Sequence, residues 1–293
     1  MRSTIALWIN SARPKTLAAS IAPVIVGAAM AWVDGPMNWL AFIITLLSAV
    51  FIQIGTNFAN DYYDHFKGSD TEGRIGPQRG IHTGQVSPAQ MKKAFITAFG
   101  IAVVLGAFLV VKGGWPIAVI GVVSVICGYL YTGGPIPLAY IGLGDVFVLV
   151  FFGPVATGGT YFLQRGDLDF NVVLAGLATG LPAVAILAVN NFRDFHSDKA
   201  ARKNTLVVRL GQTFGLYEYA FCVLGVCVIP IYLAITNPDR VFCLLALLTL
   251  PFSIRMIRTM ASYPPAETLN DLLANTGKLL ICFSLLFAIG YVL

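Results

Sequence analysis

The chain has 293 residues, of which 57% are hydrophobic and only 11% are charged, and its mean hydropathy is +0.78. Soluble domains usually carry about 25% charged residues, so this composition excludes an ordinary soluble protein and indicates an integral membrane protein. The net charge of +5 is compatible with a nucleic-acid partner. However, the basic residues are placed as in an oriented membrane protein, and we expect neither a nucleic-acid partner nor an obligate protein partner, only the lipid bilayer.

Apolar stretches long enough to cross a bilayer follow one another along the whole chain. At about 20 residues per span, they predict an all-α polytopic membrane protein with nine transmembrane helices. We expect one domain, residues 1–293, with the helices arranged around a central cavity that is roofed by cytoplasmic loops. The predicted spans are 16–33, 38–60, 89–111, 116–133, 141–163, 170–191, 214–235, 240–259 and 276–293.

Lysine and arginine are distributed unequally between the two ends of these helices. If the N-terminus is cytoplasmic, all 19 basic residues except Lys112, Arg165 and Arg240 lie on the cytoplasmic side. The positive-inside rule therefore predicts an inner-membrane protein whose N-terminus and polar loops are cytoplasmic and whose C-terminus is outside. The alternative is a secretory signal peptide over residues 17–31, but its removal would leave eight spans and nothing that requires export.

Two clusters of acidic residues stand where a long apolar segment ends. The first is the stretch 60–64 (Asn-Asp-Tyr-Tyr-Asp), and the second is the stretch 190–194 (Asn-Asn-Phe-Arg-Asp). An ionised Asp at a membrane helix costs several kcal/mol unless it faces a polar cavity or a partner charge, so both clusters are candidate functional sites. Because the Asn-x-x-x-Asp pattern recurs four predicted helices apart, a weak internal repeat could bring the clusters face to face across one cavity.

The spacing within each cluster favours a shared ligand. Residues three or four apart on a helix project to one side, and the clusters repeat that spacing. Oxygen ligands suit a hard cation, and magnesium typically takes one or two carboxylates while keeping room for water and phosphate oxygens. The sequence therefore predicts a diphosphate bridged by magnesium between the clusters, with Asp61, Asp64, Asp70, Asp194 and Asp198 as the metal ligands. Asp145, at the start of the fifth predicted span, is a further candidate cavity group.

Basic residues flank both clusters and could neutralise a diphosphate. The candidates are Lys67, Arg74 and Arg79 after the first cluster, and Arg193, Lys199, Arg202, Lys203 and Arg209 around the second. Any one of them could instead be orienting charge at the membrane surface. His65 and His196 each adjoin an Asp, but two histidines are a weak indication of a transition-metal site or of general bases.

These motifs resemble the UbiA superfamily of intramembrane aromatic prenyltransferases, which carries Asn-Asp-x-x-Asp in one inner loop and Asp-x-x-x-Asp in another. The chain is most similar to the 1,4-dihydroxy-2-naphthoate polyprenyltransferase branch, in the stretches 12–17 (Ala-Arg-Pro-Lys-Thr-Leu), 67–70 (Lys-Gly-Ser-Asp), 74–77 (Arg-Ile-Gly-Pro), 131–134 (Tyr-Thr-Gly-Gly) and 204–211 (Asn-Thr-Leu-Val-Val-Arg-Leu-Gly). The general superfamily pattern has a third Asp four residues after Asp64, where this chain has Gly68. That departure makes a metal role for Asp70 less secure.

The resemblance implies a magnesium-dependent enzyme of menaquinone biosynthesis. It would transfer a polyprenyl group from an allylic polyprenyl diphosphate to 1,4-dihydroxy-2-naphthoate, releasing diphosphate and carbon dioxide and giving demethylmenaquinol. The implied catalytic residues are Asp61, Asp64, Asp194 and Asp198, supported by Asn60 and Asn190 as substrate-binding residues. A cation must also orient the carboxylate of the acceptor, and the candidates are Arg13, Lys15, Arg79 and Arg209.

Two other functions remain open on the sequence. One keeps the chemistry but changes the acceptor, for example to 4-hydroxybenzoate. The other is an ion-coupled secondary transporter, which would be expected to carry polar residues near the bilayer midplane, whereas the acids here lie at the inner ends of helices. A phosphotransferase of the CDP-alcohol type is disfavoured, because its Asp-Gly-x-x-Ala-Arg signature does not occur.

Overall fold

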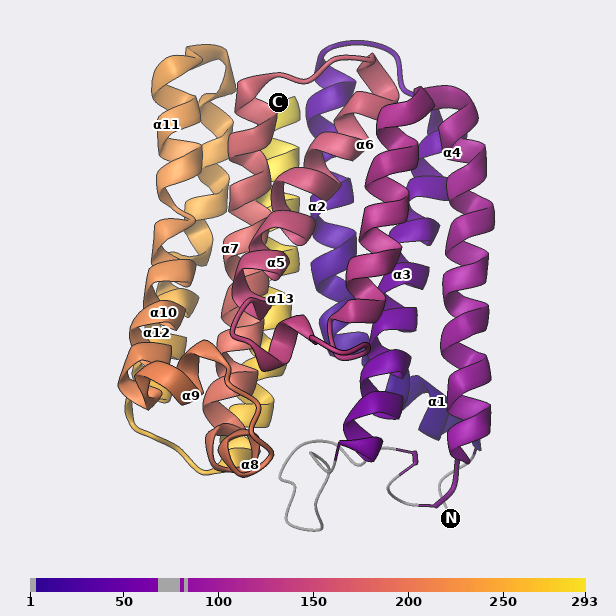
Figure 1. Cartoon of the computed structure of the whole chain (residues 1–293). Coiled ribbons are helices and arrows are strands. Elements are labelled where there is room, and N and C mark those ends of the chain that lie inside the picture. The colour runs from indigo at the N-terminus through magenta and orange to yellow at the C-terminus, as the bar shows by residue number, and fades with distance from the viewer. Residues whose placement is uncertain (1–3, 68–79, 82–83) are drawn as a thin grey trace.

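The computed structural model describes residues 4–67, 80–81 and 84–293. Across these residues every regular element is a helix, and no strand occurs among them. Figure 1 shows the long helices packed side by side as a bundle, with the N-terminus at one end and the C-terminus at the other. The predicted all-α fold is confirmed.

Eight helical stretches of the described chain are long and apolar enough to cross a membrane. They are α2 (Pro14–Val33), α3 (Trp39–Phe66), α4 (Pro88–Leu130), α5 to α6 (Gly144–Arg165), α7 (Phe170–Arg193), α10 to α11 (Gln212–Thr236), η3 to α12 (Pro238–Ala261) and α13 (Ala266–Val292). The predicted number of nine is close to this count but not identical to it.

The difference lies in α4, which contains 43 residues. A straight helix of that length would extend about 65 Å, roughly twice the thickness of the hydrocarbon core. Instead, Gly114 has a left-handed backbone (φ 68°, ψ −158°) and Pro116 follows it, so the helix breaks there. Figure 1 shows α4 turning back on itself at the end of the bundle away from the N-terminus. Its two halves correspond to the predicted spans 89–111 and 116–133.

Three of the spans are interrupted, which the sequence did not predict. The fifth predicted span consists of α5 (Gly144–Val150), a π-helical turn η2 (Phe151–Val155) and α6 (Ala156–Arg165). The seventh is divided into α10 (Gln212–Gly225) and α11 (Val228–Thr236), and the eighth into the 3-10 segment η3 (Pro238–Thr249) and α12 (Leu250–Ala261). In η2, Gly153 leaves the helical region (φ −114°, ψ −113°) just before Pro154, which accounts for that interruption.

Short helices lie between the spans. They are α1 (Thr4–Ala12), η1 (Leu138–Tyr140), α8 (Phe195–Ala200) and α9 (Leu206–Leu210). Figure 1 shows α1, α8 and α9 at the end of the bundle that carries the N-terminus. Pro14 opens α2 as its first residue, since its missing N–H has no partner to lose at that position.

Two helices extend further than predicted, and both extensions carry polar side chains to the N-terminal end of the bundle. The last turns of α3 run past residue 60 to Phe66, so the whole first acidic cluster is helical. Helix α13 begins at Ala266 rather than at 276, because Leu269 and Leu272 are buried there despite the neighbouring Asn270 and Asp271. The first turns of α13 are amphipathic, with polar residues on one face, so they do not form the continuous apolar run that predicted the other spans.

Helix α7 packs very closely against the segment that precedes α6. Gly176 and Gly180 lie four residues apart on one face of α7. A Cβ atom added at Gly176 would lie 2.6 Å from Pro154 Cα, and one added at Gly180 would lie 2.6 Å from the Leu149 carbonyl oxygen. Small residues allow this approach of two backbones, as they do between other membrane helices.

We expect Gly176→Ala to destabilise the protein, because its methyl group would overlap the backbone at Pro154. The free energy of unfolding should fall by about 1–3 kcal/mol, the usual cost of overpacking. Thermal unfolding of the protein in detergent measures the effect. Gly100→Ala in α4 is the matched control, because nothing lies within 4 Å of the added Cβ and alanine is the better helix former. Equal stability of the two variants would contradict the proposed close packing.

Candidate active site

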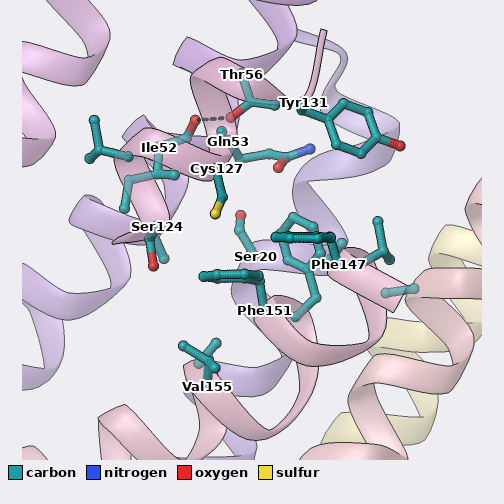
Figure 2. Close-up of a pocket in the computed structure, with 18 of the residues that line it drawn as sticks. Ser20, Ile52, Gln53, Thr56, Ser124, Cys127, Tyr131, Phe147, Phe151 and Val155 are labelled. Atoms are coloured by element: carbon teal, nitrogen blue, oxygen red, sulfur yellow. Dashed lines mark hydrogen bonds between the residues drawn. The ribbon is translucent and has the colours of Figure 1, made fainter. Parts of the chain in front are cut away.

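A cavity of about 460 Å³ lies between α2, α3, α4, α7 and the segment from α5 to α6. Most of its wall is apolar, and Figure 2 shows the rings of Phe147 and Phe151 lying parallel in it. Their centroids are 5.8 Å apart and their planes differ by 7°. Charged and amide side chains from several elements also line the cavity, namely Arg13, Asp145 and Lys203 and the amides Gln53, Asn57, Asn60, Asn190 and Asn191. A largely apolar cavity with a few polar groups suits an amphiphilic ligand.

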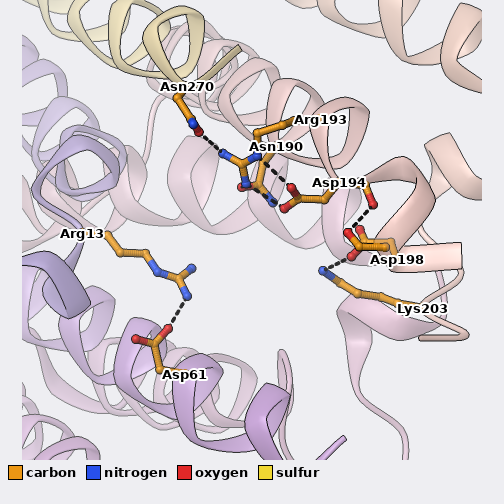
Figure 3. A network of polar contacts seen from close by, with 9 residues as sticks. Arg13, Asp61, Asn190, Arg193, Asp194, Asp198, Lys203 and Asn270 are labelled. Carbon is orange, nitrogen blue, oxygen red and sulfur yellow. Dashed lines mark hydrogen bonds and ion pairs between the residues drawn. The ribbon is translucent and has the colours of Figure 1, made fainter. Parts of the chain in front are cut away.

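The first acidic cluster is linked to the start of α2. Arg13 Nη2 lies 2.5 Å from Asp61 Oδ1, and Asp61 is only 1% exposed. Figure 3 shows this pair on the opposite side of the view from the second cluster. Arg13 has a left-handed backbone (φ 54°, ψ 68°) immediately before Pro14. Such a conformation costs a non-glycine residue of the order of 1 kcal/mol or more and is common at functional sites.

Asp64 is held by polar neighbours from two parts of the chain. The Tyr140 hydroxyl of η1 donates a hydrogen bond of 2.9 Å to Asp64 Oδ1. With its amide oriented to suit both neighbours, Asn60 donates to Asp64 at 2.5 Å and accepts from Arg13 at 3.2 Å. Asn60 therefore connects Asp64 to the Arg13–Asp61 ion pair.

Lys67 completes the first cluster. It donates to the Thr132 carbonyl oxygen at 2.6 Å, and its Nζ lies 4.5 Å from the centre of the Tyr140 ring. Burial lowers the pKa of Lys67, and the negative charge of Asp64 opposes that shift. The lysine therefore lies at the edge of the acidic cluster, next to the same tyrosine that binds Asp64.

The second acidic cluster is organised by Arg193. Its guanidinium binds both carboxylate oxygens of Asp194 at 2.7 Å and also donates to Asn190 and Asn270, each at 2.8 Å (Figure 3). Arg193 and Asp194 are both 8% exposed. A planar guanidinium matches a carboxylate in this two-bonded geometry, and the further bond to Asn270 connects the end of α7 to α13.

Asp198 of α8 is the second carboxylate of this cluster. Lys203 Nζ lies 3.3 Å from Asp198 Oδ1, and the backbone N–H of Asp198 donates to the Asp194 carbonyl oxygen at 2.8 Å. Burial raises the pKa of Asp198, the positive charge of Lys203 lowers it, and the nearby Asp194 raises it again. Asp198 thus depends on a cation to remain ionised in a buried position.

Tyr131 is placed within the electrostatic reach of both clusters. Burial raises the pKa of its hydroxyl, and the charge of Asp145 acts in the same direction, whereas Arg13 opposes it. Asp64 and Asp198 contribute smaller shifts. Because Tyr131 also lines the cavity, the two clusters and Asp145 surround one region of the cavity wall.

The carboxylates fit a hard divalent cation that binds jointly to the protein and to a phosphate-bearing ligand. Within the described residues, no three His, Cys, Asp or Glu side chains are grouped closely enough to hold a metal ion by themselves. Each cluster instead offers a few carboxylates, the number that magnesium takes when phosphate oxygens and water complete its coordination. Asp198 Oδ2 is buried and has no hydrogen-bond partner in the described part of the chain, so its lone pairs are available to a cation.

The remaining candidates from the sequence are placed less centrally. Lys15, Lys199, Arg202 and Arg209 are exposed. Arg209 donates to the carbonyl oxygens of Asn204 and Ile141, at 3.1 and 2.8 Å, and so stabilises the loop backbone. Asp70, Arg74 and Arg79 lie outside the described residues, and their predicted roles stay predictions.

Two residues that contact the clusters were not selected from the sequence. Tyr140 follows a Gly- and Pro-rich turn, and Asn270 lies at the start of α13, where no apolar run indicated a helix. Neither has a spacing relation to the acidic motifs. Only the folded chain brings Tyr140 to Asp64 and Asn270 to Arg193.

We expect Arg193→Lys to destabilise the protein although it preserves the charge. Lysine cannot form the paired contacts to Asp194 while also reaching Asn190 and Asn270, so the free energy of unfolding should fall by about 2–4 kcal/mol. Thermal unfolding in detergent measures the change. The control is Arg258→Lys, an exposed position on α12 that should be neutral. A wild-type melting temperature for the Arg193 variant would contradict this account.

Known proteins resemble nearly the whole of this chain. The model of the UbiA prenyltransferase family matches residues 20–274. The 1,4-dihydroxy-2-naphthoate octaprenyltransferase of Haemophilus influenzae is 36% identical, covering 97% of this chain and 95% of that protein. The Escherichia coli protein of the same name is also 36% identical, covering 97% and 94%.

Solved structures agree on the fold. A UbiA homolog from Archaeoglobus fulgidus is 16% identical and superposes with a TM-score of 0.68, covering 97% of this chain and 98% of that one. The same homolog bound to DMAPP and Mg2+ gives a TM-score of 0.62 at 15% identity, covering 94% and 99%. With its two acidic clusters on one membrane-embedded helical bundle and a family match over most of its length, this chain belongs to the UbiA prenyltransferase family and is a prenyltransferase enzyme.

Proposed function

We propose that this protein transfers a polyprenyl group from an allylic polyprenyl diphosphate to 1,4-dihydroxy-2-naphthoate, with loss of diphosphate and carbon dioxide, giving the demethylmenaquinol of menaquinone biosynthesis. The observation that carries the proposal is the pair of buried carboxylate–cation clusters at a largely apolar cavity. Relatives that carry the name of this activity cover nearly the whole chain at 36% identity, and they supply the identity of the acceptor.

The acidic clusters are the proposed diphosphate site. Asp61, Asp64, Asp194 and Asp198 would hold magnesium, with Asp70 as a further ligand, and Asn60 and Asn190 would bind the diphosphate beside them. Magnesium, when bound, supplies positive charge to the diphosphate oxygens. Further positive charge would come from the basic residues that flank the clusters, namely Lys67, Arg74, Arg79, Arg193, Lys199, Lys203 and Arg209. Stabilising the negative charge that accumulates on the leaving diphosphate is what allows its C–O bond to break.

The apolar part of the cavity is the proposed site of the isoprenoid chain. Bond cleavage leaves an allylic carbocation, which water would trap if it had access. The aromatic faces of Phe147 and Phe151 line the cavity and can stabilise a cation without reacting with it. The same apolar wall keeps water away from the cation.

Arg13 is the proposed partner of the acceptor carboxylate. Of the four candidates from the sequence, it is the one that the described cavity wall includes, whereas Lys15 and Arg209 are exposed and Arg79 lies outside the described residues. Arg13 binds Asp61 and Asn60 through its two terminal nitrogens. Since a guanidinium has five N–H donors, donors remain for a second carboxylate.

The reaction balances without any further reactant. The ring carbon that bears the carboxylate forms a bond to the allylic carbon, using ring electrons, and the C–O bond electrons leave with the diphosphate. The bond to the carboxylate carbon then breaks, carbon dioxide departs, and its electron pair restores the aromatic ring. Arg13 would release the carboxylate as its charge disappears.

The protein is a multi-pass membrane protein. We propose that it lies in the inner membrane with its N-terminus and its acidic clusters on the cytoplasmic side and its C-terminus outside. The argument is the distribution of basic residues, of which only Lys112, Arg165 and Arg240 lie on the other side. In this orientation the cavity could accept the water-soluble diphosphate end of the substrate from the cytoplasmic side and its lipid-soluble tail from the bilayer.

The direct test is product analysis by chromatography. Purified protein with geranyl diphosphate and 1,4-dihydroxy-2-naphthoate should give a prenylated, decarboxylated naphthoquinol with magnesium and none with EDTA. Product with 4-hydroxybenzoate but not with the naphthoate would retain the mechanism and reject the acceptor. Absence of product with every aromatic acceptor would reject the proposed function.

We expect Asp64→Asn and Asp194→Asn to reduce transfer by at least about 100-fold, because each removes a carboxylate that is proposed to hold the metal and diphosphate. Turnover under saturating magnesium measures the effect, and size-exclusion chromatography checks that the variants remain folded. Asp271→Asn is the control, since that aspartate is exposed on α13 near the same end. Near-normal turnover in both variants would remove the metal-bridge proposal.

A further inference from the structure

One carboxylate on the cavity wall belongs to neither acidic cluster. Asp145 lies in the first turn of α5, is 6% exposed, and lines the cavity together with Tyr131 and Phe147. Its Oδ1 is buried and has no hydrogen-bond partner among the described residues. No cation of the described chain forms an ion pair with it, in contrast to Asp61, Asp194 and Asp198.

A buried carboxylate oxygen without a partner is costly, because it has lost its water and gained no donor. Such a group persists when a ligand supplies the missing donor, so Asp145 points to a ligand with a hydroxyl or N–H group. The adjacent wall suits an aromatic ligand, since Phe147 and Phe151 lie parallel there (Figure 2). The isoprenoid chain has no donor, so the aromatic acceptor is the substrate that fits.

We propose that Asp145 binds the acceptor by accepting a hydrogen bond from the ring hydroxyl next to the reacting carbon, and that it assists carbon–carbon bond formation. The inference rests on the proposed function and adds a catalytic residue to it. Arg13 and Asp145 both lie close enough to Tyr131 for their charges to act on its hydroxyl. An aromatic acid with its carboxylate and hydroxyl on neighbouring carbons presents one group to each of them.

The proposed role follows from where charge develops. When the ring carbon attacks the allylic cation, the hydroxyl oxygen donates electrons and becomes positively charged. Its proton then moves toward Asp145, and it returns to the oxygen as carbon dioxide leaves and the ring becomes aromatic again. Asp145 ends in its starting protonation state, so no further reactant is required. The hydrogen bond is strongest in the transition state, which is the condition for a rate effect.

The other carboxylates are less suited to this role. Asp194 and Asp198 are bound to Arg193 and Lys203, and they belong to the proposed diphosphate site. Glu218 of α10 also has a buried oxygen without a partner among the described residues, and it interacts electrostatically with Asp145. It is not one of the residues that line the cavity, so it cannot contact a ligand there.

The test is Asp145→Asn, which keeps the size of the side chain and removes the charge, with Glu218→Gln as the matched control. We expect the Asp145 variant to form prenylated naphthoquinol from geranyl diphosphate and 1,4-dihydroxy-2-naphthoate about 100- to 10,000-fold more slowly than wild type, the range of general acid–base effects. The Glu218 variant should remain close to wild type. Binding of geranyl diphosphate in the presence of magnesium should be unchanged in the Asp145 variant, because the clusters are intact.

Thermal unfolding distinguishes a functional role from a structural one. The Asp145→Asn variant should melt at or above the wild-type temperature, because it removes a buried charge that has no ion pair within the described residues and on which Lys203 acts only from beyond ion-pair distance. The inference is overturned if that variant keeps more than a tenth of the wild-type rate, if its rate falls only with the amount of folded protein, or if binding of geranyl diphosphate is lost as well. A wild-type protein that does not prenylate the naphthoate would reject the proposed function instead.

Discussion

Compensation of buried negative charge is the constraint on which the rest of this structure depends. Asp61, Asp194 and Asp198 are each less than a tenth exposed, and each has a cation within ion-pair distance. Removing one partner from such a pair leaves an uncompensated charge, which typically costs about 3–5 kcal/mol. The Arg13–Asp61 pair therefore holds the end of α3 against the start of α2, and Arg193, while paired with Asp194, also joins the end of α7 to α13 through Asn270.

The same arrangement separates two chemical environments within one cavity. Part of the cavity wall is polar and includes the side chains of Arg13, Asn60, Asn190 and Lys203. Most of the remaining wall is apolar. A prenyl diphosphate has a matching division between a highly charged end and a hydrocarbon chain. The close packing of α7 against η2 at Gly176 and Gly180 positions the segment that carries the aromatic wall. The fold thus places ion pairing and exclusion of water within reach of the same ligand.

The internal repeat of the sequence has only a partial counterpart in the structure. Asn60 and Asn190 occupy equivalent places in the two motifs, and both line the cavity. Their contacts differ, however, since Asn60 bridges Arg13 and Asp64, whereas Asn190 accepts from Arg193 three residues later. The arginine that pairs with the first cluster, Arg13, lies at the start of α2 rather than in α3. The arginine of the second cluster, Arg193, lies within the motif itself. The repeated motif is therefore matched by two asparagines that line the same cavity, but it did not predict their different contacts.

The helical membrane class, the approximate positions of the spans and the two acidic clusters could be predicted from composition and local patterns, because each depends on composition or on spacing within a few turns. Lipid excludes polar backbone that is not satisfied by its own helix, so long apolar runs could only be helices. The partners of the clusters depended on tertiary structure. Arg13 meets Asp61, Tyr140 meets Asp64 and Asn270 meets Arg193 across at least 48 residues of chain. Such contacts leave no local pattern, since they arise only when separate helices pack together, and the same packing leaves Asp145 Oδ1 on the cavity wall without a hydrogen-bond partner among the described residues.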